Sequence, residues 1–175
     1  MHRNAEIIRR GYQAFNTADM TTLTELFDEN ASWHTPGRGS IAGDRVGRDA
    51  VFAQFGRYGG ETGGTFKAEL RHVLADDEGR VVGIHHNSGV RNGQQLDVDC
   101  CIVFEIRSGR ITSGREHFYN LHAWEQFWAE PNESRLCRAG TGGSIMPPPN
   151  NRMQRTAPGV SSRVLSAHFQ KETRR

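Results

Sequence analysis

The stretch 94–106 constrains the fold of this chain more than any other. Its even-numbered positions from 96 onward are all apolar, whereas the odd-numbered ones include two aspartates and a glutamate. Alternation with a period of two is typical of a β-strand with one face in the core. Asp97 and Asp99 are then expected on the outer face, unless a bulge at Cys100 and Cys101 changes the register.

Three further stretches alternate in the same way and surround the central one. They cover residues 65–74, 80–91 and 110–120. Asn92-Gly93, between the second of these and the central stretch, is the strongest two-residue hairpin signal in the chain. The four stretches together predict an antiparallel meander.

Apolar residues recur at spacings of three and four in residues 5–16, 19–27 and 49–58, which is typical of amphipathic helices. A short strand is expected at 31–35, a glycine-rich loop at 37–47 and a closing helix at 122–129. Because helices precede a run of strands, the pattern predicts an α+β fold. We expect a cone-shaped α+β barrel, in which a curved antiparallel sheet wraps around three N-terminal helices.

Composition divides the chain into a domain at 1–130 and a tail at 131–175. Five of the six prolines follow Ala129, without sustained periodicity, so the tail is predicted to be disordered. It holds seven Arg, one Lys and two Glu, a net charge of +6, which leaves −4 for the domain because the whole chain carries +2. Because the positive charge lies in the tail and the domain is acidic, the charge does not indicate a nucleic-acid-binding surface on the domain. We therefore expect no specific nucleic-acid partner.

The three cysteines, Cys100, Cys101 and Cys137, do not suggest a disulfide framework, because neighbouring strand residues point to opposite faces. The first residues lack an apolar signal segment, and no window approaches the length that spans a bilayer. The sequence therefore predicts a cytoplasmic protein without a membrane partner. Since nucleotide-binding glycine motifs and metal-ligand spacings are also lacking, we expect no cofactor and no metal.

Several segments resemble the SnoaL-like branch of the nuclear transport factor 2-like superfamily. They are YQAFNTADMTTLTELFDENASWHTPG, GRDAVFAQF, GTFKAEL, RNGQQLDVD and AWEQFWA. The resemblance covers about residues 5–129 and implies the conical fold and a homodimer. The segment NNRMQRTAP also resembles the ends of proteins from mobile integron gene cassettes. The superfamily includes isomerases, hydrolases, dehydratases, cyclases and binding proteins, so the fold alone names no reaction.

Active-site positions of the relatives can be compared with this chain. The resemblance places the general base of the ketosteroid isomerases at Thr35, their oxyanion tyrosine at Gly11 and their protonated aspartate at Ile102. That triad is therefore absent. The acid of the polyketide cyclases falls at Asn120, and an amide cannot transfer the proton in the same way.

Titratable side chains on apolar faces provide the remaining catalytic candidates. We assign the even positions of 80–91 to the inner face, which points His86 into the cavity, and the resemblance does the same for Glu116. A histidine and a carboxylate whose pKa rises in an apolar cavity form a general acid–base pair, with His34 assisting. Alternatively, they are a core histidine, a neutralised carboxylate and a turn residue. The expected ligand-binding residues are Tyr12, Phe15, Trp33, Thr35, His72, Phe104, Phe118 and Asn120.

These residues favour a cofactor-independent isomerase, hydrolase or cyclase. It would act on an apolar, oxygen-bearing small molecule by proton transfer or by activation of water. The alternative is a noncatalytic module that binds a small molecule in the same cavity. In both cases the outer face of the sheet, with Cys101 and Val103, is the expected homodimer interface.

Overall fold

The computed structural model describes residues 2–130, which form four helices and six strands. In chain order the elements are α1 (Arg3–Thr17), α2 (Met20–Leu26), β1 (Phe27–Thr35), β2 (Gly43–Val46), α3 (Arg48–Glu61), β3 (Lys67–Ala75), β4 (Arg80–Arg91), β5 (Gln94–Arg107), β6 (Arg110–Phe118) and α4 (Leu121–Trp128). The predicted tail at 131–175 lies outside the described residues.

All six strands form one sheet in the order β2-β1-β6-β5-β4-β3. Neighbouring strands pair antiparallel, except that β1 and β6 run parallel. β2 comes from the segment expected to be a glycine-rich loop, and β1 begins at Phe27, four residues before the expected start. The predicted α+β fold is confirmed, with one parallel pair that the sequence did not indicate.

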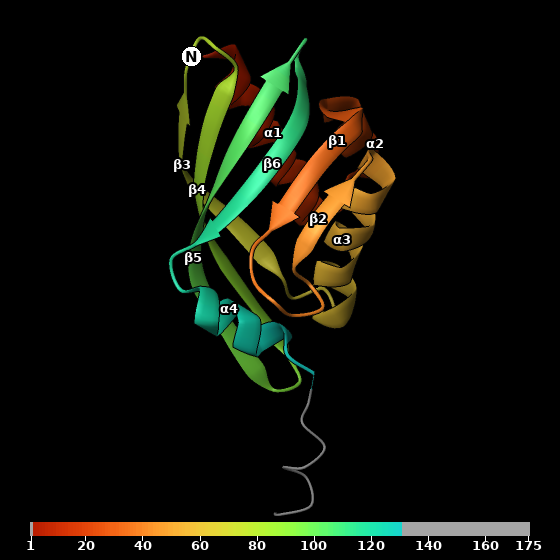
Figure 1. Cartoon of the computed structure of the whole chain (residues 1–175), viewed down its shortest axis with the longest axis vertical. Coiled ribbons are helices and arrows are strands. Elements are labelled where there is room, and N and C mark those ends of the chain that lie inside the picture. Colours follow the sequence, from red (N-terminus) through yellow and green to blue (C-terminus); the bar gives the residue numbers. More distant parts are fainter. Residues whose placement is uncertain (1, 131–175) are drawn as a thin grey trace, which may run out of the picture. The chain divides into compact units, whose positions relative to one another are not determined.

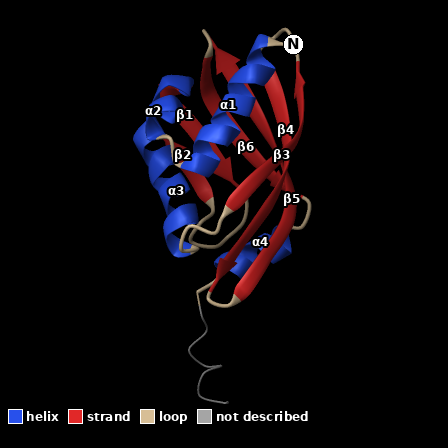
Figure 2. Ribbon diagram, turned by 180° about the vertical axis from the view of Figure 1, so that it is seen from behind, coloured by secondary structure: helices blue, strands red, loops and turns tan. Residues whose placement is uncertain are grey.

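Three helices cover one face of the curved sheet (Figure 1). α1 packs on β3 and β4, whereas α3 packs on β1 and β2. Figure 2, seen from behind, shows α1 and α3 side by side in front of the strands, with α4 at one end. α4 contacts β5 and β6, and its Trp124 and Trp128 reach the aromatic core at Tyr58. The sheet and helices thus enclose a single core that is closed at one end by α4.

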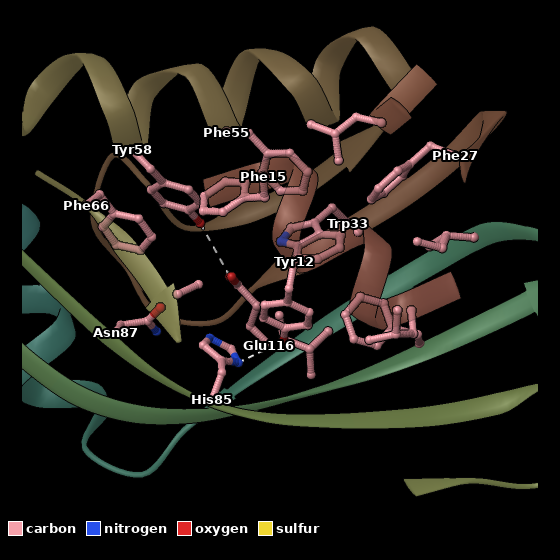
Figure 3. A pocket seen from close by; sticks show the side chains of 17 residues that line it. Tyr12, Phe15, Phe27, Trp33, Phe55, Tyr58, Phe66, His85, Asn87 and Glu116 are labelled. Carbon is pink, nitrogen blue, oxygen red and sulfur yellow. Dashed lines mark hydrogen bonds between the residues drawn. The ribbon is translucent and has the colours of Figure 1, made fainter. Parts of the chain in front are cut away.

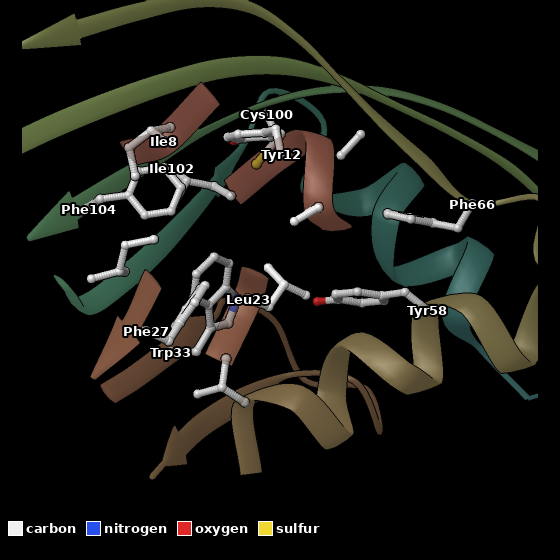
Figure 4. Close-up of a cluster of buried hydrophobic side chains, with 14 of the residues drawn as sticks. Ile8, Tyr12, Leu23, Phe27, Trp33, Tyr58, Phe66, Cys100, Ile102 and Phe104 are labelled. Carbon is white, nitrogen blue, oxygen red and sulfur yellow. The ribbon is translucent and has the colours of Figure 1, made fainter. Parts of the chain in front are cut away.

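The inner face of β5 is the one that its alternation predicts. Its six even-numbered side chains from 96 to 106 are buried, and Figure 4 shows three of them, Cys100, Ile102 and Phe104, in the core cluster. The outer residues Asp97 and Asp99 lie on the opposite face, as expected, and the cysteine doublet forms no bulge with β4.

The inner face assigned to β4 was wrong. Arg91 pairs with Gln94 across the Asn92-Gly93 hairpin, so each even position of β5 faces an odd position of β4. Directly opposite residues of an antiparallel pair share a face. The inner side chains of β4 therefore include His85 and Asn87, and His86 points outward.

A bulge in β3 corrects the expected position of His72. Leu70 pairs with His85, but His72 pairs with Ile84, so Arg71 is an extra residue on the β3 side. One extra residue moves every later side chain to the other face of the sheet. Val73 therefore packs against the core, while His72 is exposed.

Candidate functional site

A cavity of about 60 Å³ lies between the concave face of the sheet and α1 and α3. Figure 3 shows Phe55 and Tyr58 from α3 on one side of it, and His85 and Asn87 from β4 on the other. Pockets for drug-sized ligands usually measure about 300–1,000 Å³, so a ligand of more than a few heavy atoms requires side chains to move.

Two of the lining side chains are only partly buried, and we expect them to form the entrance. They are Phe15 on α1 and Phe55 on α3, whose ring centroids lie 5.3 Å apart in an edge-to-face arrangement. Every other residue that lines the cavity is buried. We therefore expect a ligand to enter the cavity between these two rings.

Glu116 is the carboxylic acid of the cavity. It lies on β6 opposite Ile102 of β5 and is only 5% exposed. The hydroxyl of Thr35 donates a hydrogen bond of 2.6 Å to its Oε2, and the hydroxyl of Tyr58 donates a longer one of 3.5 Å. Burial raises the pKa of Glu116 to about 7, although these donors and the nearby indole N–H of Trp33 oppose the increase. The indole lies outside hydrogen-bond geometry.

His85 forms a second polar group with Tyr12. The Nδ1 atom of His85 lies 2.8 Å from the Tyr12 hydroxyl, and both side chains are buried. Burial lowers the pKa of His85 to about 4, so its ring is neutral at neutral pH. Burial also raises the pKa of Tyr12 well above its ordinary value, which keeps its hydroxyl proton in place. The carboxamide of Asn87, 2% exposed, lies beside the ring and opposes the decrease in its pKa.

Glycines on the sheet make room for two aromatic side chains of the site. A side chain at Gly114 would overlap the ring of Trp33, and a Cβ atom at Gly83 would lie 3.0 Å from the Tyr12 hydroxyl. Trp33 can lie flat against β6, and Tyr12 can reach His85, because these two positions lack side chains.

The structure brings many of the predicted ligand-binding residues together. Tyr12, Phe15, Trp33 and Phe104 line the cavity together with Glu116. Thr35 reaches the site through its hydrogen bond to Glu116.

Both histidines proposed for catalysis lie on the outer face, which corrects their expected positions. His86 places its Nδ1 2.8 Å from Asp99 and its Nε2 3.5 Å from Asp97. His34 places its Nδ1 2.7 Å from Oδ1 of Asp44, across the β1–β2 pair. Trp33 and Thr35 occupy the inner face of β1, and the residue between them must point away.

Three predicted ligand-binding residues lie away from the cavity. His72 is turned outward by the β3 bulge. Phe118 stacks on Trp124 of α4 with ring centroids 4.0 Å apart. Asn120 caps α4, since its side chain accepts a hydrogen bond from the backbone N–H of Ala123.

The sequence did not predict four polar residues of the site. Tyr58, His85 and Asn87 line the cavity, and Gln54 donates a hydrogen bond to the hydroxyl of Tyr58. The signal for the two on β4 was present, because a two-residue hairpin combined with an even inner face on β5 requires an odd inner face on β4. Tyr58 lies at helical spacing from Phe55 and Val51, which predicts that it faces the core. That spacing does not show which polar group its hydroxyl contacts.

Two features of residues 2–130 bear on other classes of function. No group of three or more His, Cys, Asp or Glu in this range is arranged to hold a metal ion. No helix in the same range combines the length and the apolar character that crossing a membrane requires.

Comparisons with known proteins agree with the fold and the sequence motifs. The model of the SnoaL-like domain matches residues 8–114. An uncharacterized protein of Mycobacterium tuberculosis is 32% identical over 124 residues, which cover 71% of this chain and 95% of the relative.

Solved structures extend the comparison. Bal32a, from a soil-derived mobile gene cassette, is 70% identical with a TM-score of 0.72, over 73% of this chain and 97% of its own. The expected similarity to gene-cassette proteins is thus confirmed. IdmH of Streptomyces antibioticus, named as a candidate polyketide cyclase, is 19% identical with a TM-score of 0.60, over 71% of this chain and 98% of its own. At that identity the similarity shows the fold alone. The chain belongs to the SnoaL-like domain family.

Proposed function

We propose that this protein is an enzyme that acts on a small, apolar, oxygen-bearing molecule by general acid–base proton transfer. The observation that carries the proposal is Glu116, a carboxyl group buried in an apolar cavity with its pKa raised to about 7. A group that titrates near the working pH can both take and return a proton. The family resemblance and the candidate polyketide cyclase IdmH are consistent with this class of chemistry.

The neutral pair of Tyr12 and His85 supplies the second half of the mechanism. When Nδ1–H of His85 donates to the oxygen of Tyr12, the Tyr12 hydroxyl is free to donate to a ligand oxygen. As Glu116 removes a proton from carbon next to a carbonyl, the electron pair moves to the carbonyl oxygen, where the Tyr12 donor stabilises the charge. Return of the proton from Glu116 to another atom of the ligand completes the cycle.

The same geometry also supports activation of water. A water molecule that donates to ionised Glu116 loses its proton to the carboxylate as its oxygen attacks the substrate. The resulting oxyanion then accepts a hydrogen bond from Tyr12. The two chemistries require the same two groups, and the identity of the substrate distinguishes them.

The test is turnover of epoxide, ketone and lactone panels by wild type and four variants. Glu116→Gln is expected to lower turnover by about 10²–10⁴-fold and to leave residual binding, because positioned proton transfer contributes that much. His85→Ala should also lower turnover, because the Tyr12 hydroxyl loses the partner that directs its proton to the ligand. The wild-type rate should rise with pH through a midpoint near 7, since the base is the ionised form of Glu116.

Matched controls come from the outer face. His86→Ala changes the neighbouring histidine on the opposite side of β4, and Glu105→Gln changes an exposed glutamate of β5; both should keep wild-type turnover. Equal loss in His85→Ala and His86→Ala would contradict the proposal. Saturable binding of panel members by wild type without any product would replace it with the noncatalytic binding module.

We further propose that the outer face of the sheet pairs with a second copy of the chain. Val82 lies opposite Val103, and Ile84 lies opposite Cys101, so four partly exposed apolar side chains form one patch. Leu74, 58% exposed and paired with Val82, extends the patch onto β3. The family resemblance favours a homodimer at this face.

A further inference from the structure

The two oxygens of the Glu116 carboxyl group have different surroundings. Oε2 accepts the hydrogen bonds from the hydroxyls of Thr35 and Tyr58. Within residues 2–130 no donor forms a hydrogen bond to Oε1, and the nearby indole Nε1 of Trp33 is without a hydrogen-bond partner. Thr35 comes from β1 and Tyr58 from α3, and both donors converge on the same oxygen. This leaves Oε1 as the oxygen available to a molecule in the cavity.

Gln54 determines the direction in which Tyr58 donates. Its Nε2 donates to the carbonyl oxygen of Ile41 at 2.7 Å and to the hydroxyl of Tyr58 at 3.3 Å. A backbone carbonyl only accepts, so the nitrogen of the Gln54 amide must face Ile41. The oxygen of Tyr58 is then already an acceptor, and its single proton is directed to Glu116.

The burial of these groups makes their arrangement rigid. Gln54 and Tyr58 are each 2% exposed and Thr35 is 1% exposed, so water does not compete for their hydrogen bonds. Tyr58 is also packed between Phe66 and Phe55, with ring centroids 5.0 Å and 6.4 Å away. Burial and packing therefore hold the hydroxyl of Tyr58 beside Glu116 in this structure.

We infer that Thr35, Tyr58 and Gln54 are positioning residues. Thr35 and Tyr58 hold Oε2 of Glu116 by hydrogen bonds and Gln54 orients Tyr58, so that Oε1 exchanges the proton with the ligand. The inference rests on the proposed acid–base role of Glu116. Hydrogen bonds to the carboxylate stabilise its ionised form, whereas burial disfavours it. These three residues thus set the proton affinity of the catalytic group through their hydrogen bonds to Oε2 and to one another.

The experiment is a carbon-13 NMR titration of the Glu116 carboxyl group, whose resonance is assigned by its loss in Glu116→Gln. Thr35→Val removes a donor at nearly constant volume, and the titration midpoint should rise by about one pH unit or more. Tyr58→Phe removes the longer bond and should raise it less. Gln54→Met, which frees the Tyr58 proton to turn away, should raise it in the same direction.

Two variants separate positioning from general disturbance of the fold. Thr35→Ser keeps the hydroxyl and should restore the wild-type midpoint. Tyr119→Phe alters a tyrosine that is 67% exposed and should leave the midpoint unchanged. Unchanged midpoints in both Thr35→Val and Tyr58→Phe, with a native amide spectrum, would overturn the inference.

The readout needs no substrate, so its failure differs from failure of the proposed function. Raised midpoints without turnover on any panel would support the positioning residues and count against the enzyme. Turnover that depends on Glu116, with midpoints that do not move, would support the enzyme and overturn the positioning role.

Discussion

The hydroxyl of Thr35 lies 2.6 Å from Oε2 of Glu116, although 81 positions separate the two residues in the chain. The parallel pairing of β1 with β6 brings them together, because it places Trp33 beside Gly114 and His34 beside Arg115. The pKa of a buried carboxyl group that accepts one short hydrogen bond remains higher than the pKa of a carboxyl group in water. Burial of Glu116, which the Thr35 hydrogen bond only partly offsets, makes the stability of the fold depend on pH.

We expect Glu116→Gln to remove a contribution to stability that decreases with pH between about pH 4.5 and 7. Because the pKa of Glu116 is raised from 4.5 to about 7, the folded state binds the proton more tightly than the unfolded state. The stabilisation is complete below pH 4.5 and is lost as pH rises through 7, amounting to about 3 kcal/mol. Urea unfolding of wild type and variant at pH 5, 6, 7 and 8 measures the difference.

The comparison of wild type with Glu116→Gln cancels the contribution of other groups. His85, whose pKa is lowered to about 4, acts in the opposite direction and loses its stabilisation as pH falls from 6.5 through 4. The variant should therefore show stability that rises with pH in that range. Identical pH profiles for wild type and variant would contradict the raised pKa.

Phe15→Ala and Phe55→Ala should each speed the entry of a small apolar probe into the cavity, because the two rings form its partly exposed entrance. Stopped-flow fluorescence with 1-naphthol measures the association rate. Each substitution should also cost about 2 kcal/mol of folding free energy, less than the 3–5 kcal/mol of a fully buried phenylalanine.

Phe52→Ala is the matched control for the entrance. Phe52 lies on the same helix and stacks on Phe55, with ring centroids 6.2 Å apart, but it does not line the cavity. Its loss should destabilise the fold without changing the association rate. A similar acceleration in all three variants would mean that general loosening, rather than an opened entrance, admits the probe.

Val103→Asp should convert a dimer into a monomer, because it places a charge in the middle of the apolar patch on the outer face. Light scattering after gel filtration gives the mass over a range of concentrations. Glu105→Gln, on the same strand and face, should remain dimeric. A monomeric wild type throughout that range would rule out this interface.

The alternation in β5 identified the central strand and its inner face because that strand is regular over its whole length. The same reasoning failed for β4, where a plausible apolar face, Val82 and Ile84, belongs to the outer surface. Both faces of β4 carry apolar residues, so composition could not choose between them. Pairing with β5 through the hairpin decided the register and brought His85 inside in place of His86.

The sequence by itself determined the α+β class, the central strand, the apolar cavity and the acid at Glu116, because these follow from local periodicity and from the motifs of the family. Only the tertiary structure decided which polar side chains meet that acid. Thr35, Tyr58 and Gln54 reach it from β1 and α3, and the bulge at Arg71 turns His72 away. Periodicity fixes the face of a residue within one element, whereas register, bulges and a parallel strand pair fix its partners, and these depend on contacts between distant segments.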